Sequence, residues 1–180
     1  MGFFDDAPVP EPAPARRHHP WEPPEAEFPG IVPIDTLLLG RTDQAAVAVT
    51  GLSAFSAGIE IFLTARIRPQ PGPLDLAGYR HSFRFGLQFS DGGRAVGNLG
   101  GRPDRDREPG GPVLYSTAGG GGPHSFISRW WTWPLPAAGQ LEFVCEWSAF
   151  GMAESRAGID AQLILDAAQR SIRLWPDSKG

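Results

Sequence analysis

Alternation of apolar and polar residues is the feature that most limits what this chain can fold into. Three segments, residues 59–67, 83–89 and 141–147, place an apolar side chain at every second position. Successive side chains of a β-strand point to opposite faces, so each segment has one apolar and one mostly polar face. A strand of this kind needs a second layer to bury its apolar face. The sequence therefore predicts an all-β, mainly antiparallel fold of two packed sheets.

Weaker patterns add further strands and the connections between them. We expect strands at residues 44–52, 113–116 and 125–133. Ser90-Asp91-Gly92-Gly93 can take positive φ, which predicts a hairpin into Arg94–Gly97. The Gly- and Pro-rich segments 97–112 and 119–122 are typical of loops. The expected fold is a β-sandwich of about seven to nine strands, with a β-barrel-like closure as the alternative.

The C-terminal segment has the spacing of a short helix. Residues 161–171 are rich in alanine and repeat their apolar positions every three or four residues, and Asp160 is a candidate N-cap. A hairpin of residues 162–165 with 171–175 is the competing interpretation. We favour the helix because alanine has the highest helix propensity.

The N-terminal segment differs from the rest of the chain. Eight prolines lie between residues 5 and 29, with few aliphatic side chains among them. Such a segment lacks the apolar area that would offset the entropy cost of ordering it. We therefore expect residues 1–27 to be a disordered, proline-rich, acidic tail and residues 28–180 to be one β-sandwich domain. Phe3 and Phe4 could dock on a partner, or they could be part of a frayed end.

Charge is concentrated in this tail. Residues 1–27 hold six acidic side chains against Arg16 and Arg17, whereas the remainder holds fourteen acidic and fourteen basic side chains. Nucleic-acid-binding domains usually carry a basic excess, because phosphate contacts supply much of their affinity. The neutral body predicts that nucleic acid is not the partner.

Cysteine use and hydropathy bear on the compartment. Cys145 is the only cysteine, so it forms no bridge within the chain, as is usual in the cytoplasm. Asp5 and Asp6 directly follow Phe3 and Phe4, which does not match a signal peptide. The apolar run 59–65 is far shorter than a membrane span. We expect a soluble, cytoplasmic protein without membrane insertion.

The segment Arg129-Trp130-Trp131-Thr132-Trp133 is the best candidate for a binding site. On a strand, Trp131 and Trp133 would face one way and Trp130 the other. An open tryptophan beside Arg129 could stack on a sugar ring, an aromatic ligand or a partner surface. Burial under a loop is the alternative, since large aromatic side chains are usually buried. The candidate binding residues, with the two aromatic residues of the tail, are Arg129, Trp130, Trp131, Trp133, Phe3 and Phe4.

Ionisable residues do not form a recognisable catalytic or metal-binding pattern. The chain has no phosphate loop, Gly-x-Ser-x-Gly or His-Glu-x-x-His signature. Its histidines (His18, His19, His81 and His124) lack the spacing of metal ligands, so we expect no metal and no cofactor. Glu60 could pair with Glu142 or Glu146 for acid–base chemistry, although solvated carboxylates are the simpler interpretation. Cys145 alternates with Phe143 and is expected to be structural.

Several strings in the body resemble those of uncharacterised proteins from high-GC bacteria. These strings are PPEAEFPGIVP (23–33), LLLGRTDQ (37–44), FRFGLQFSDG (83–92), RWWTWPLP (129–136) and EFVCEW (142–147). The resemblance implies one intact domain in a cytoplasmic setting. It assigns no activity, cofactor or catalytic residue to any position.

Three functional hypotheses remain at this point. The first is a non-catalytic binding or interaction module that contacts a protein partner through the surface of the β-sandwich and through its tail. The second is a hydrolase or a carbohydrate-active or carbohydrate-binding protein with a site near residues 130–133. The third is a small-ligand-binding β domain. An interaction module predicts an exposed apolar patch or an uncovered strand edge, whereas an enzyme predicts converging ionisable groups in a pocket.

Overall fold

The computed structural model describes residues 18–70, 81–97, 104 and 107–175. The elements with fully described bounds are strands, the α-helix α2 and the short 3-10 helix η1. The strands are β1 (Glu27–Phe28), β2 (Gly30–Ile31), β3 (Leu37–Arg41), β4 (Ala45–Ala54), β5 (Ile59–Ile67), β6 (Phe83–Gln88), β7 (Arg94–Gly97), β8 (Val113–Gly122), β9 (Ser125–Trp133), β10 (Gln140–Trp147), β11 (Met152–Asp160) and β12 (Ile172–Arg173). The helices are η1 (Ser148–Phe150) and α2 (Gln162–Ala168).

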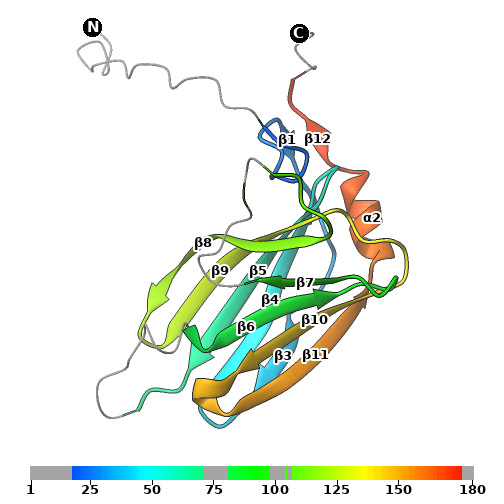
Figure 1. The fold of residues 1–180 in the computed structure, drawn as a ribbon. Coiled ribbons are helices and arrows are strands. Elements are labelled where there is room, and N and C mark those ends of the chain that lie inside the picture. Colours follow the sequence, from blue (N-terminus) through cyan, green and yellow to red (C-terminus); the bar gives the residue numbers. More distant parts are fainter. Residues whose placement is uncertain (1–17, 71–80, 98–103, 105–106, 176–180) are drawn as a thin grey trace, which may run out of the picture.

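Two antiparallel sheets face each other, as the alternation of the sequence predicts (Figure 1). One sheet has the order β2-β4-β5-β9-β8, with β3 also paired to β4, and the other has the order β11-β10-β6-β7. At the two sides of the sandwich β3 lies against β11 and β7 lies against β8, yet the sheets do not join into a closed barrel. The predicted sandwich is therefore confirmed, and the barrel-like alternative is not.

The three strongly alternating segments form β5, β6 and β10, and their apolar faces meet between the sheets. Direct register pairs place Phe143 opposite Leu87, and Cys145 opposite Phe85. The most deeply buried aliphatic and phenylalanine side chains include Val47, Val49, Ile59, Ile61, Leu63, Phe85, Leu141 and Phe143. Burial of apolar area on this scale is the main favourable contribution to folding.

The Trp130 side chain packs between the two sheets at the side where β7 approaches β8. Its side chain has no exposed surface, and its ring centroid lies 5.2 Å from that of Phe85. The indole Nε1 donates a hydrogen bond of 2.8 Å to Ser128 Oγ. A Cβ on Gly97 would come within 2.5 Å of the Trp130 ring, so this ring fills the space that the glycine leaves.

The glycine run at residues 119–122 is a strand and not the predicted loop. β8 continues through Gly122, and Gly119 to Gly122 pair with Ser128 to Ser125 of β9. The prediction was wrong because ladder hydrogen bonds use only backbone groups, which glycine retains. The hairpin at residues 90–93 is confirmed, with Gly92 at φ 88. Of the predicted loop 97–112, residues 98–103 and 105–106 lie outside the described part.

The C-terminal helix is confirmed as α2, and the competing hairpin is not formed. The helix begins after Ala161, and the Asp160 carboxylate accepts a hydrogen bond of 2.9 Å from the backbone N–H of Gln162. Its buried face packs closely on β2, where a Cβ on Gly30 would lie 1.9 Å from the Ala167 carbonyl oxygen. No helix in the described ranges has the length and apolar character needed to cross a membrane.

Changing Gly97 to Ala should destabilise the fold by about 1–3 kcal/mol, because the new methyl group would overpack the Trp130 ring. Urea denaturation followed by tryptophan fluorescence measures the difference. Gly110→Ala is the matched control, since a Cβ at Gly110 meets no atom within 4 Å. Equal midpoints for the two variants would show that Gly97 is not needed to seat Trp130.

Candidate functional site

The structure buries two of the three tryptophans that the sequence proposed for binding. Trp130 and Trp131 have no exposed surface, so neither can stack on a ligand in this conformation. The two side chains face opposite ways, as predicted. Trp130 belongs to the core between the sheets, whereas Trp131 belongs to a second, separate cluster with Phe55 and Tyr115. Trp133 is half-buried beside that second cluster, and Arg129 is exposed. Phe3 and Phe4 lie outside the described residues.

Trp131 holds the N-terminal segment against the sandwich. Its indole Nε1 donates a hydrogen bond of 2.9 Å to the backbone carbonyl of Trp21. On the outer face of its sheet, Trp131 packs edge-on against Phe55 at 5.5 Å and lies directly opposite Tyr115. A Cβ on Gly58 would meet the Trp131 ring at 2.7 Å, so that glycine makes room for it. Trp131 therefore contacts another part of the chain through its indole N–H.

The segment that Trp131 anchors contacts the sandwich at Trp21. Trp21 is buried, and its ring stacks on that of His19 with centroids 4.6 Å apart. His18 Nε2 donates a hydrogen bond of 2.7 Å to the carbonyl of Pro23. Glu27, the last residue of the predicted tail, is the first residue of β1. This segment leads directly into β1.

β1 and β12 form a two-stranded ribbon whose two faces differ in polarity. Phe28 lies directly opposite Ile172, and Glu27 lies opposite Arg173. Because residues directly opposite each other share a face of the ribbon, one face is apolar and the other is charged. The apolar face is open to solvent, with Phe28 60% exposed and Ile172 61% exposed.

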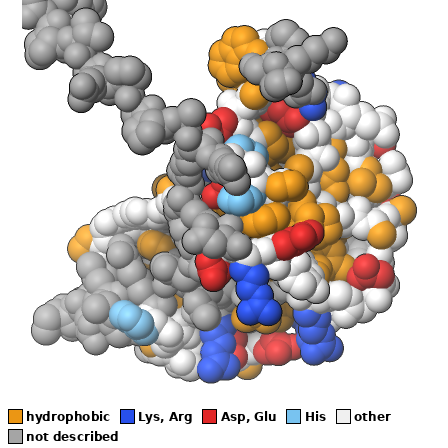
Figure 2. All heavy atoms as spheres, turned by 45° about the horizontal axis from the view of Figure 1, so that its top comes forward, with side chains coloured by type: hydrophobic (Ala, Val, Ile, Leu, Met, Phe, Trp, Pro, Cys, Tyr) orange, Lys and Arg blue, Asp and Glu red, His pale blue; other side chains and the backbone are white. Residues whose placement is uncertain are grey.

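Two further exposed apolar residues lie three positions from this pair in the sequence, one after Phe28 and one after Ile172. Ile31 is 67% exposed and Trp175 is 63% exposed. We call Phe28, Ile31, Ile172 and Trp175 the end patch. Figure 2, which brings this end forward, shows hydrophobic side chains on this face interspersed with charged and other polar side chains.

Hydrogen bonds from several elements fix the backbone beneath the end patch. Arg170 donates from Nη2 to the Ile31 carbonyl (3.1 Å) and from Nη1 to the Asp166 carbonyl (2.9 Å). The backbone N–H of Leu174 donates to the Ala26 carbonyl at 2.8 Å. The Glu27 carboxylate accepts hydrogen bonds from the backbone N–H and the hydroxyl of Ser56. The patch is therefore presented on a backbone held by both ends of the described chain, which lowers the entropy cost of binding.

The carboxylates considered for acid–base chemistry do not come together. Glu60 lies on the outer face of β5, whereas Glu142 and Glu146 lie on the outer face of β10 in the other sheet. Glu60 contacts Arg129, with Oε1 and Nε 3.5 Å apart, and the Arg129 guanidinium lies 5.3 Å from the centre of the Phe62 ring. Burial raises the pKa of Glu60, and the Arg129 charge only partly offsets this effect.

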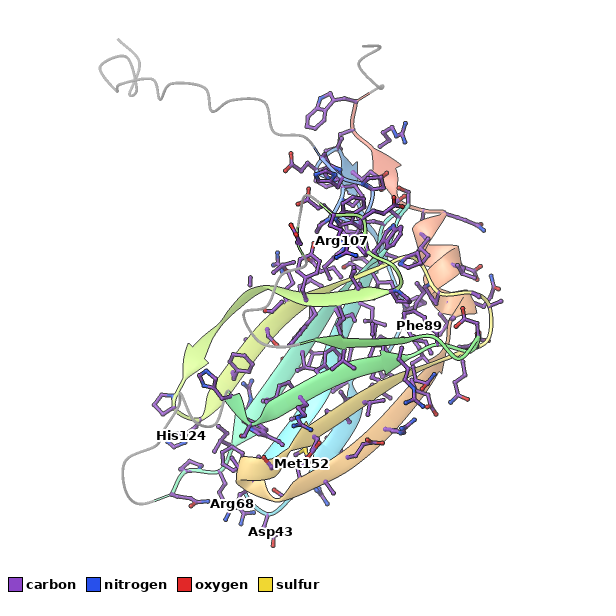
Figure 3. The ribbon with its side chains drawn as sticks, viewed as in Figure 1. Asp43, Arg68, Phe89, Arg107, His124 and Met152 are labelled. Carbon is purple, nitrogen blue, oxygen red and sulfur yellow. The ribbon has the colours of Figure 1, made fainter. Side chains whose placement is uncertain are left out.

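The remaining reactive side chains are also separate. Burial raises the pKa of the Cys145 thiol to about 11, so it is a neutral thiol at pH 7 and not a nucleophile. His124 lies at the end of the sandwich away from β1 and β12 (Figure 3). Within the described ranges, no three or more His, Cys, Asp or Glu side chains are grouped so that they could hold a metal ion.

The sequence interpretation missed all four residues of the end patch. Phe28 and Ile31 sit in a proline-rich stretch, and Ile172 and Trp175 sit beyond the helix, so none belongs to an alternating run. The available signal was the presence of large apolar residues outside any predicted strand or helix face. Because these residues lie on no predicted strand or helix face, nothing in the sequence assigns them to the core.

Changing Trp131 to Phe should loosen the N-terminal segment. The variant keeps an aromatic ring but removes the N–H that pairs with the Trp21 carbonyl, which should cost about 1–3 kcal/mol. Amide hydrogen exchange should become faster at residues 18–26 and stay unchanged in β10. Trp175→Phe, at an exposed tryptophan, is the control. Unchanged exchange at residues 18–26 would show that this hydrogen bond does not hold the segment.

Changing Glu60 to Gln should stabilise the protein at pH 7. A folded-state pKa raised above the unfolded value means that the ionised carboxylate disfavours the folded state once the pH exceeds both values. The advantage of the variant should shrink as the pH falls towards about 4, where wild-type Glu60 is protonated. Urea midpoints at the two pH values measure this, with Glu108→Gln at an exposed position as control. A variant less stable than wild type at pH 7 would mean that the Arg129 contact outweighs the cost of burial.

The structure thus presents exposed apolar side chains on a hydrogen-bonded backbone at one end, and it buries Trp130 and Trp131 while Trp133 is half-buried and Arg129 is exposed. Comparison with protein-family models, curated proteins and solved structures finds no match to this chain.

Proposed function

We propose that this protein is a non-catalytic protein-binding module that contacts its partner through the end patch. The observation that supports this proposal is the uncovered apolar face of the β1–β12 ribbon. A two-faced ribbon normally turns its apolar side toward a core. Here Phe28 and Ile172 point to solvent as a directly opposed pair, and contiguous exposed apolar surface is typical of interaction sites.

The composition of the end patch suits a protein partner. Tryptophan and phenylalanine are large side chains with few rotatable bonds, and aromatic residues are enriched at the energetic centres of interfaces. Complete burial of one large apolar side chain contributes about 1.5–3 kcal/mol. The four residues together could supply several such contributions, from which the entropy cost of association must be subtracted.

Charged residues border the end patch, and they would lie at the rim of a contact with a partner. Arg170 and Arg173 are both exposed and lie within three residues of Ile172. Glu25 and Glu27 likewise lie within three residues of Phe28, so both signs of charge border the end patch, and complementary charges on a partner's rim would speed association. The neutral body argues against nucleic acid as the partner. We place the interaction in the cytoplasm, a setting that suits a protein with a single cysteine.

The enzyme and carbohydrate hypotheses have less support among the described residues. Trp130 and Trp131, which would have formed a stacking platform, are buried. Glu60 and the two carboxylates of β10 lie on opposite outer faces of the sandwich, so Glu60 is too far from either of them for acid–base work.

The test is affinity capture from the lysate of the source organism with matched surface variants. Replacing Phe28, Ile172 and Trp175 together with Ser should deplete specific partners at least tenfold, as measured by quantitative mass spectrometry. The control replaces Leu38 and Ile127 with Ser, because these residues are about half exposed at other positions. Both variants should retain the wild-type circular dichroism spectrum.

Two results would overturn the proposal. Full recovery of the wild-type partners by the triple variant would exclude the end patch. Loss of the partners on deletion of residues 1–17, with all four patch residues intact, would place binding in the N-terminal segment instead. Light scattering at several protein concentrations adds a further arm, in which concentration-dependent dimerisation that the triple variant abolishes would identify a second copy as the partner.

A further inference from the structure

A hollow lies on the outer face of the four-stranded sheet, on a surface separate from the end patch. Val144, Gly86 and Val96 are consecutive register partners on β10, β6 and β7, so they form one row across the sheet. All three positions face outward, and Val96 is 73% exposed. Because Gly86 has no side chain, the row is lowest at its centre. The resulting hollow has a volume of about 240 Å³.

Polar side chains of the neighbouring rows border this apolar floor. On one side, Arg84 of β6 lies opposite Glu146 of β10, with a contact of 3.6 Å. On the other side, Gln88 of β6 lies opposite Arg94 of β7. Arg156 of β11 closes the end of the row beyond Val144. The hollow is therefore an apolar floor with a polar rim.

The charges on this rim leave one arginine without a carboxylate. Arg156 pairs with Glu142 at 3.2 Å and with Glu154 at 2.8 Å, and Arg84 contacts Glu146. The two glutamates that line the hollow, Glu146 and Glu154, thus already have cationic partners. Arg94 has no acidic partner among the described side chains, and its hydrogen bond goes to the neutral amide of Gln88.

The Arg94 side chain is held in place by its neighbours. Its Nε donates a hydrogen bond of 2.7 Å to Gln88 Oε1. Gln88 is itself fixed, because its Nε2 donates to the carbonyls of Gly93 (3.1 Å) and Phe89 (3.4 Å) in the hairpin. The hydrogen bond from Nε orients the guanidinium of Arg94. Its two terminal nitrogens make no hydrogen bond within the described ranges. A positioned guanidinium with both terminal nitrogens unused suits bidentate binding of a carboxylate.

We propose that this hollow is a binding site for a small carboxylic acid with an apolar or aromatic body. The body lies over Gly86 between Val144 and Val96, and the carboxylate pairs with Arg94. The hollow is smaller than the roughly 300–1,000 Å³ of sites for drug-sized ligands, which limits the body to about one ring. A bare anion would leave the valine floor uncovered, and an uncharged ring would leave Arg94 without a partner.

Benzoate is the probe for this site, titrated into ¹⁵N-labelled full-length protein and followed by amide chemical shifts. We expect saturable shifts at Gly86, Val96 and Val144. Acetate supplies the charge without the ring, and benzyl alcohol supplies the ring without the charge. Each should bind about tenfold more weakly than benzoate or worse, since each lacks one of the two interactions.

Two variants test the assigned roles. Arg94→Gln should weaken benzoate binding about tenfold and bring it close to that of benzyl alcohol. Gly86→Val should abolish binding by filling the hollow, at the cost of a close contact with the Ala95 carbonyl, which a Cβ would approach to 3.2 Å. Arg41→Gln, at an arginine of β3 that does not line the hollow, is the matched control. If Gly86→Val does not fold, the Arg94 variant alone decides the question.

The proposal is overturned if benzoate leaves the three amides unshifted at saturating concentration. It is also overturned if Arg94→Gln binds benzoate as tightly as the wild type, or if acetate and benzoate bind equally well. None of these outcomes bears on the end patch, because that patch and the hollow share no residue.

Discussion

The contact between the inward apolar faces of the two sheets is the constraint on which the rest of this structure depends. Each strand contributes one face to that contact and leaves the other face outside, so the core determines what is available on the surface. Trp130 is the clearest example, because its indole fills the space at Gly97 where β7 of one sheet approaches β8 of the other. With that side of the sandwich occupied by packed side chains, binding surfaces remain at the end of the sandwich and on the outer faces of the sheets.

The outward-facing neighbour, Trp131, connects the core to the proposed interaction surface. Its hydrogen bond to the Trp21 carbonyl holds a segment that carries no regular structure of its own before β1. That segment delivers β1 to the end of the sandwich, where it pairs with β12 from the opposite end of the described chain. An aromatic side chain that looked like a ligand platform thus has a structural role, and the apolar surface that it helps to position belongs to other residues.

On the outer faces of the two sheets, the register of strand pairing decides which side chains become neighbours. On β5, Glu60 lies beside Trp131 and near Arg129, which produces a half-buried carboxylate with a raised pKa. On β6, Gly86 is flanked by two valines, which produces a hollow bordered by arginines. Neither arrangement resembles a catalytic centre, because the ionisable groups in each are paired or isolated. Both depend on which strand lies next to which, a property of the sheet as a whole.

The sequence by itself determined the β class, the sandwich, the hairpin at residues 90–93, the C-terminal helix and the opposite orientations of Trp130 and Trp131. These features follow from local spacing, since a period of two assigns each residue to a face and alanine-rich spacing favours a helix. Only the tertiary structure decided that Gly119–Gly122 forms a strand, that Trp131 is buried, and that Phe28 meets Ile172. Local spacing states which way a side chain points, but it does not state which strand or segment that side chain will meet. Pairing between distant segments is settled by the packing of the whole chain, and both proposed binding surfaces are products of such pairing.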